Sequence, residues 1–82
     1  MSKRESIEIN SDILTLCVEP RRKTHIVYKT NINFKLLDRY VPYLVKRGFL
    51  SFNEEKGVYQ TTSEGLKWLK MAKALLIEEI AN

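Results

Sequence analysis

Apolar residues near the start of the chain recur at helical spacing. Ile9, Ile13, Leu16 and Cys17 fall on one face of a helix. Pro20 ends this pattern, because the residue before a proline is pushed out of the α-helical region. The pattern predicts a first helix over residues 4–18.

The next stretch, residues 24–47, predicts two helices joined by a short polar turn. Thr24 is the expected N-cap of the first of these, a short helix over residues 25–29 with Ile26 as its buried anchor. The turn at residues 30–33 favours local side-chain hydrogen bonds, and Asn33 is the expected N-cap of a longer helix over residues 34–47. Pro42 lies inside that helix and predicts a kink, with the helix continuing beyond it.

This longer helix is amphipathic. Its apolar face comprises Leu37, Tyr40, Val41 and Leu44. We expect that face to pack on the first helix, which leaves the polar face free to contact a partner.

Two short runs follow Gly48, which is expected to end the longer helix in a left-handed conformation. Residues 49–52 and 58–61 predict two strands around a turn that contains Gly57. Thr62 is the expected cap of a last helix over residues 63–81. Three helices, a two-stranded β-hairpin and a long C-terminal helix predict an α+β fold, a winged helix-turn-helix. We expect one domain over residues 1–82, with residues 49–61 as the wing.

The positive charge of the chain is concentrated in one segment. Residues 20–47 hold eight basic residues and one acid, Asp38, a net charge of +7, whereas the whole chain of 82 residues carries only +4. The remainder therefore sums to −3. A positive field on a helix-turn-helix, an element shaped to enter the major groove, indicates a module that binds double-stranded DNA.

The basic segment and the wing hold the candidate DNA-binding residues. The loop before the second helix and the start of that helix are expected to contact phosphates, because free backbone N–H groups there attract anions. Lys35 and Arg39 lie one turn apart, opposite the apolar face, and should reach bases or phosphates together with the asparagines of the turn. The full set is Arg21, Arg22, Lys23, Thr24, His25, Asn31, Asn33, Lys35, Arg39 and, at the wing, Lys56. Simple solvent exposure is the alternative for the basic loop and for His25, and Glu54 and Glu55 would repel phosphate from the wing.

Other classes of protein lack the residues they need. A single cysteine and a single histidine provide neither a disulfide nor a metal site, and we expect Cys17 to be a packed core thiol. No phosphate-binding glycine loop, nucleophile elbow or paired carboxylates occur, so we predict no enzyme, no cofactor and no small-molecule ligand. No apolar run reaches the roughly 20 residues of a membrane span, and the polar start lacks a signal peptide, so a cytoplasmic location is expected.

The last helix carries more apolar surface than its own domain needs. Leu66, Trp68 and Leu69 are expected to close the core against the first helix. The residues expected to pair with the same helix of a second chain are Leu75, Leu76, Ile77 and Ile80. Lys73 and the acids near the end favour an antiparallel partner, because opposite charges then meet. The alternative is that the first helix covers this patch within one chain.

The chain resembles a known family in its motifs. The matching positions are K-T-x-I-x-Y-K-x-N at residues 23–31, then Leu37, Tyr40, Leu44, Gly48 and Leu50, and Y-x-x-T-x-x-G at residues 59–65. They are similar to the archaeal winged-helix family of small transcriptional regulators and chromatin-associated proteins. The resemblance implies a DNA-binding protein, in some members a dimer through a C-terminal antiparallel coiled coil, and short relatives resemble regulators of archaeal viruses and plasmids. Pro42 and the short last helix depart from the family pattern.

Three functions fit these observations. The leading hypothesis is a dimeric, sequence-specific regulator of transcription, which would bind a palindromic site with half-sites about 34 Å apart or a multiple of that. The second is an architectural protein that coats DNA with little sequence preference. The third is a winged helix that binds another protein, with its basic face merely solvated.

Overall fold

The protein folds as four helices and one β-hairpin. A computed structural model describes the backbone of residues 3–81 and the side chains of residues 6–76. The elements are α1 (Lys3–Leu16), α2 (Lys23–Thr30), α3 (Phe34–Lys46), β1 (Leu50–Asn53), β2 (Val58–Thr61) and α4 (Ser63–Ala81). The predicted α+β winged helix-turn-helix is confirmed, with element bounds that differ from the predicted ones by no more than two residues.

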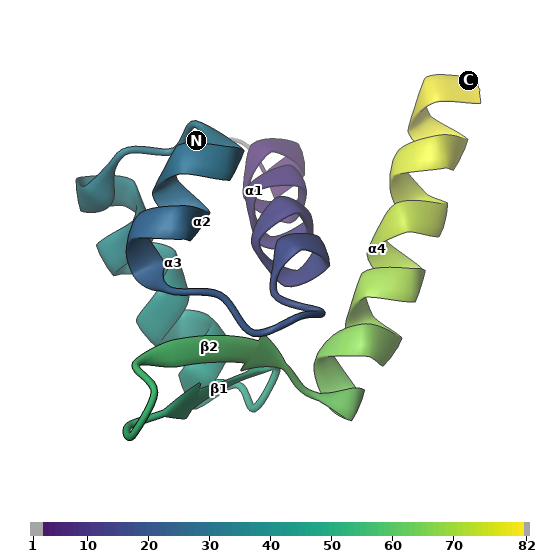
Figure 1. Ribbon diagram of the computed structural model, residues 1–82. Helices are drawn as coiled ribbons and strands as arrows, with labels where there is room; N and C mark the ends of the chain where they lie inside the picture. The colour runs from purple at the N-terminus through teal and green to yellow at the C-terminus, as the bar shows by residue number, and fades with distance from the viewer. Residues whose placement is uncertain (1–2, 82) are drawn as a thin grey trace.

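Helix α1 lies at the centre of the molecule (Figure 1). Helices α2 and α3 lie on one side of it, α4 runs alongside it on the other, and the hairpin closes one end. The outward side of α3 therefore faces away from α4, and the exposed surfaces of these two helices lie on different sides of the protein.

The hairpin carries a third extended segment that the sequence pattern did not reveal. Strands β1 and β2 pair antiparallel with Phe52 opposite Tyr59. On the other side of β2, the Arg21 backbone N–H donates to the Tyr59 carbonyl at 2.9 Å and the Tyr59 N–H donates to the Arg21 carbonyl at 2.7 Å. This bridge ties the loop before α2 to the wing.

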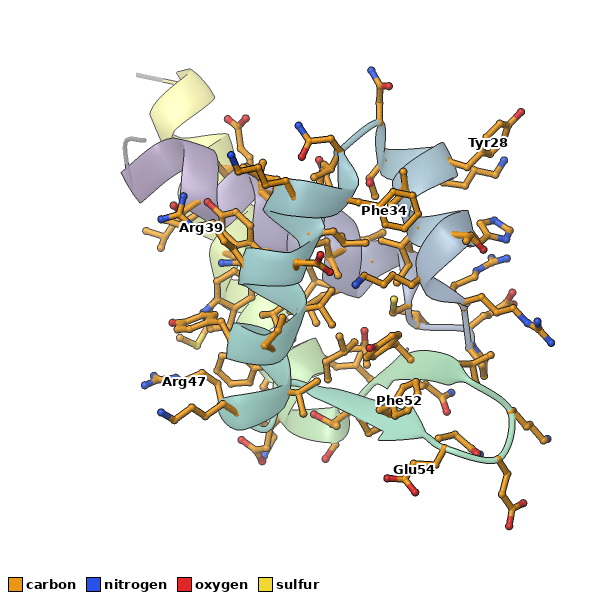
Figure 2. The ribbon with its side chains drawn as sticks, turned by 90° about the vertical axis from the view of Figure 1, so that its left-hand side faces the viewer. Tyr28, Phe34, Arg39, Arg47, Phe52 and Glu54 are labelled. Atoms are coloured by element: carbon orange, nitrogen blue, oxygen red, sulfur yellow. The ribbon has the colours of Figure 1, made fainter. Side chains whose placement is uncertain are left out.

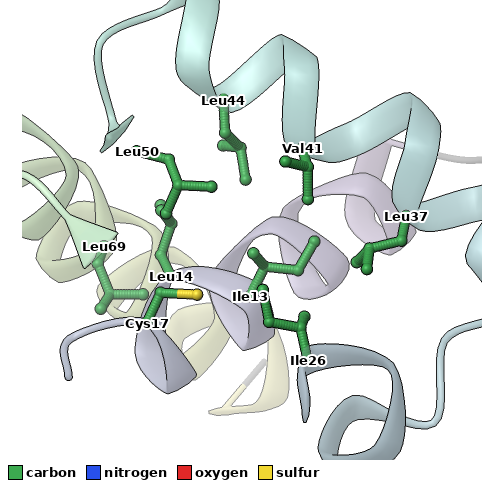
Figure 3. Close-up of a cluster of buried hydrophobic side chains, with 9 residues drawn as sticks. All are labelled: Ile13, Leu14, Cys17, Ile26, Leu37, Val41, Leu44, Leu50 and Leu69. Atoms are coloured by element: carbon green, nitrogen blue, oxygen red, sulfur yellow. The ribbon is translucent and has the colours of Figure 1, made fainter. Parts of the chain in front are cut away.

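The core is built where α1, α2, α3, β1 and α4 meet (Figure 3). Its buried side chains are Ile13, Leu14, Cys17, Ile26, Leu37, Val41, Leu44, Leu50 and Leu69. The predicted apolar face of α3 is thereby confirmed, with Tyr40 half-buried at its edge. Helix α3 also continues through Pro42, as expected.

Most of the predicted helix caps are present, but the predicted N-cap of α2 is wrong. The Asn33 side chain accepts from the Leu36 N–H at 2.8 Å, the Thr62 hydroxyl accepts from the Gly65 N–H at 3.0 Å, and Gly48 has a φ of +79°. Thr24, however, is the second residue of α2 and does not cap it. The bridge to Tyr59 keeps the chain extended as far as Arg22, which is the N-cap and makes no side-chain cap hydrogen bond.

Helix α4 is rotated relative to our expectation. Leu69 and Ala72 are buried, and Trp68 stacks on Phe49 with ring centroids 5.9 Å apart. Leu66, expected in the core, is 46% exposed because α4 turns the row containing Gly65 and Leu69 toward the body of the protein. The expectation that Leu66 closes the core is therefore wrong.

Cys17 is a core thiol, as predicted from its place on the apolar face of α1. It is fully buried, and burial raises the pKa of its thiol to about 12, against a smaller opposing effect of Arg21. Because the thiolate is the nucleophile, alkylation of the folded protein by iodoacetamide should stay negligible up to pH 9 or 10. Mass spectrometry of protein treated with and without urea tests this: rapid labelling of the folded protein would contradict it, and labelling in urea is the positive control.

Candidate nucleic-acid interface

The exposed side of α3 carries one row of residues, spaced four, three and four positions apart: Lys35, Arg39, Pro42 and Lys46. We call this set the outer row of α3. It lies opposite the buried face of the same helix, because helix positions three and four residues apart share a side. All four residues are exposed, and the row contains three cations and no acid. Figure 2 labels Arg39, the arginine of this row, on α3.

The flank of the outer row that faces α2 is occupied by an ion pair. The Lys23 ammonium, at the first residue of α2, donates to a carboxylate oxygen of Asp38 on α3. The side chains are 37% and 58% exposed respectively, so the pair lies at the surface next to the row. The only acid of the basic segment is therefore matched by a cation that we had assigned to phosphate binding.

The opposite flank of α3 is aromatic and faces α1. Tyr40 and Ser6 share a hydrogen bond between their hydroxyl oxygens at 3.2 Å, and Tyr43 is 49% exposed. The Arg47 guanidinium lies 6.0 Å from the centroid of the Tyr43 ring. These contacts support the flank of α3 that is turned away from α2. The ion pair of Lys23 and Asp38 supports the other flank.

The three adjacent basic residues before α2 diverge in space. Arg21 turns back: its Nε donates to the Leu16 carbonyl at 3.3 Å and its guanidinium lies 3.4 Å from a Glu19 carboxylate oxygen. Lys23 turns toward Asp38 on α3. Arg22 lies between them and is exposed.

The start of α2 remains an anion-attracting element. Its first turn contains no acidic residue, and its backbone N–H groups are not capped by the Arg22 side chain. A cleft beside it is lined by Pro20, Arg21, Arg22, Thr24, His25, Tyr28 and Val58. Thr24 is exposed and His25 half-buried, with its Nε2 buried and without a hydrogen-bond partner among the described residues.

The side chains of the two asparagines in the turn differ in how available they are for contact with a partner. Asn33 uses its side-chain oxygen to cap α3, which leaves its amide nitrogen available. Asn31 ends α2 in the left-handed conformation, with a φ of +59°, and its side chain is exposed. Asn31 is thus the freer of the two predicted contacts.

The wing carries acidic side chains at its tip and aromatic side chains on its face. Lys56 is exposed in the turn at residues 54–57, next to Glu54 and Glu55. Phe52 is 45% exposed, and its ring centroid lies 4.6 Å from that of Tyr59 (Figure 2). The wing therefore adds little positive charge to the interface.

Two exposed residues beside these candidates were not in the predicted set. Lys46 belongs to the outer row, and its spacing of seven from Arg39 would have placed it there. Tyr28 is 82% exposed on α2 and lines the cleft with His25. No spacing rule pointed to Tyr28, because the second helix is too short to show a face.

The described part of the chain holds neither a metal-binding cluster nor a membrane-spanning helix. Among side chains 6–76, no group of three or more His, Cys, Asp or Glu residues comes together to hold a metal ion. Within residues 3–81, no helix combines the length and apolar character of a membrane span.

The fold and the basic outer row define a class of protein, the winged helix-turn-helix proteins. The chain belongs to this family, which it matches over residues 3–79. Such domains are typically non-enzymatic DNA-binding domains, so membership suggests DNA binding by this protein.

An archaeal protein provides a relative. The chain is 32% identical over 66 residues to an uncharacterised protein of Methanocaldococcus jannaschii. The matched region covers 79% of this chain and 66% of the relative, so the chain spans about two thirds of the relative's length. No solved structure shows a significant match.

Proposed function

We propose that the protein is a dimeric, sequence-specific DNA-binding regulator of transcription that places α3 in the major groove. The observation that carries this proposal is the outer row of α3, which presents Lys35, Arg39 and Lys46 opposite the core without an acid among them. A helix fits the major groove, and an arginine there can donate two hydrogen bonds to guanine. Arg39, near the middle of the row, is the candidate for that contact.

The start of α2 would hold the backbone of the same duplex. Its uncapped N–H groups, exposed Arg22 and Thr24 form an anion-attracting corner at the start of α2, whose first residue, Lys23, contacts Asp38 on α3. Phosphate contacts of this kind position a protein on DNA without reading sequence. Arg21 contributes less, because its guanidinium is already held by Leu16 and Glu19.

Selection of bound sequences from a random duplex pool tests the proposal, followed by titrations of the selected and of a random duplex at several salt concentrations. We expect a preferred, palindromic sequence and binding that weakens steeply with salt. Salt-sensitive binding without a preferred sequence would favour an architectural protein. Absence of salt-sensitive binding would contradict DNA binding and favour a protein-interaction module.

The dimer would form through an exposed apolar stripe on α4. Half-buried Trp68 is followed three and seven positions later by Met71, 65% exposed, and Leu75, 56% exposed. Leu76 is half-buried and lies four positions after the buried Ala72, and the side chains of Ile77 and Ile80 lie outside the described residues. An apolar stripe of this kind marks an interaction surface, and the same stripe of a second chain, running antiparallel, is complementary to it.

Replacing Leu75 with glutamate should dissociate the dimer without unfolding the chain, because Leu75 is exposed and Leu69 and Ala72 form the packing against α1. Sedimentation at micromolar concentration should give two chains for the parent and one for Leu75→Glu. Ala74→Glu is the control, because it adds the same charge at an exposed position about 100° around the helix. A monomeric parent, or a Leu75→Glu variant that remains dimeric, would exclude this interface.

A further inference from the structure

Asp38 is an unexpected residue on a DNA-facing helix. It is the only acid between Pro20 and Asn53, and it borders the outer row three residues after Lys35 and four before Pro42. Its side chain is 58% exposed, so burial does not explain its presence. A carboxylate at this place repels the phosphates of every duplex, whatever the base sequence.

The exposed part of position 38 offers hydrogen-bond acceptors and no donor. The ionised carboxylate is acceptor-only. Its main-chain carbonyl faces Pro42, four residues on, which has no amide hydrogen to donate to it. The polar side chains of the neighbouring outer row, Lys35, Arg39 and Lys46, are donors only, so position 38 is chemically distinct from them.

Only one base presents the complement of such a position in the major groove. Guanine and thymine present acceptors, and adenine presents its amino group next to the acceptor N7. Cytosine presents the N4 amino donor and no acceptor of its own. An exposed carboxylate on a helix in the major groove therefore matches cytosine.

In the free protein, the carboxylate is held by Lys23. Lys23 is the first residue of α2, beside the uncapped N–H groups that suit a phosphate. Exposed ion pairs contribute little net stability in water, so exchanging one partner for another is easy. A base that takes the carboxylate leaves the lysine free for the DNA backbone.

We propose that Asp38 reads a cytosine amino group in the major groove and thereby releases Lys23 to a backbone phosphate. The inference rests on the proposed function of α3. On a duplex without cytosine at that position, Lys23 stays on Asp38 and one phosphate contact is missing. Asp38 is thus a specificity-determining residue, and it couples the reading of one base to the affinity for the backbone.

Asp38→Asn is the variant that tests the base contact, because asparagine has nearly the same shape, lacks the charge and suits adenine. Selection from a random duplex pool should give a cytosine at one position of each half-site for the parent. For Asp38→Asn that position should relax or change to adenine, while the other positions remain. The ratio of selected-site to random-duplex affinity should fall about 5- to 150-fold, in part because random duplex binds more tightly.

Lys23→Met tests whether Lys23 moves from Asp38 to a backbone phosphate when the selected site is bound. For the selected site, the dependence of log affinity on log salt should become shallower by about one unit, whereas for random duplex it should not change. Glu64→Gln is the matched control for Asp38→Asn, since it removes one negative charge at the exposed start of α4 and should leave the selected sequence unchanged. Circular dichroism melts should show that both test variants fold like the parent.

The results separate this inference from the proposed function. A parent without salt-sensitive binding, or with binding but no preferred sequence, would overturn both sequence-specific function and the role of Asp38. A parent that selects a sequence which Asp38→Asn selects equally well would leave the function standing and exclude Asp38 as a reader. Equal changes of the salt dependence on both duplexes for Lys23→Met would overturn the exchange.

Discussion

Replacing Lys35, Arg39 and Lys46 together with alanine should reduce DNA binding more than any other set of surface changes. If each contacts one phosphate or base, the salt dependence of log affinity should become shallower by about two to three units. The loss of affinity at moderate salt should then reach about a hundredfold or more. Fluorescence anisotropy with a labelled duplex at several salt concentrations measures both quantities.

The matched control replaces Lys67, Lys70 and Lys73 with alanine, and sedimentation must show that it associates like the parent, because Lys73 was expected at the dimer contact. These lysines are also exposed, but they lie on α4, on another side of the molecule from the outer row (Figure 1). The same charge is removed in both variants, so a general loss of positive charge would affect them equally. Equal losses of affinity would show that the outer row is not the contact surface.

Arg39→Ala alone separates base reading from charge. A guanine contact with two hydrogen bonds contributes about 1–3 kcal/mol of discrimination against other bases. The selected sequence should therefore lose its preference at one position of each half-site. An unchanged preference would remove Arg39 from the base-reading set and leave it as a phosphate contact.

Replacing Gly65 with alanine should destabilise the fold severely. An added Cβ would lie 2.1 Å from the carbonyl oxygen of Phe49 and 2.8 Å from a methyl group of Thr61. The carbonyl cannot simply turn away, because it accepts from the Thr62 N–H at 3.0 Å. Helix α4 must shift instead, which should lower the free energy of unfolding by about 3 kcal/mol or more.

Urea unfolding followed by circular dichroism measures this loss, and Gly48→Ala is the comparison. At Gly48 no atom lies within 4 Å of an added Cβ, so only its φ of +79° opposes a side chain. Forcing alanine into that conformation costs about 1–2 kcal/mol. A Gly65→Ala variant as stable as Gly48→Ala would contradict the close packing of α4 on the end of α3 and the hairpin.

Much of the fold is local, and for that reason the sequence predicts it. The apolar face of α3 follows from the spacing of Leu37, Val41 and Leu44, and the ends of the elements follow from residues that cap or turn the chain. Asn33 and Thr62 are polar residues directly before an apolar helical pattern, and both make the predicted hydrogen bonds.

The contacts that the sequence did not predict join residues that are distant along the chain. The bridge between Arg21 and Tyr59 spans 38 positions, and it starts α2 at Lys23, which makes Thr24 an internal residue. The pair of Lys23 and Asp38 spans 15 positions, and no local pattern signals it. These contacts determine which of the basic side chains remain available to bind a partner.

The buried side of α4 was predicted wrongly for a different reason. Its apolar residues are distributed around much of the helix, so spacing alone allows more than one buried side. Contacts with α1 and with Phe49 select the side that contains Leu69, and Leu66 and Met71 are left exposed. The rotation of such a helix is set by its neighbours.

The separation of the outer row of α3 from the core has an evolutionary consequence. Exposed residues outside special contacts usually change stability by less than about 0.5 kcal/mol when substituted. Lys35, Arg39 and Lys46 are exposed, whereas Leu37, Val41 and Leu44 on the same helix are buried. A lineage with this fold can therefore exchange the residues of the row, and with them its proposed target sequence, while mutations that threaten folding are confined to the other side of the helix. A protein built in this way can change what it binds faster than it changes its structure.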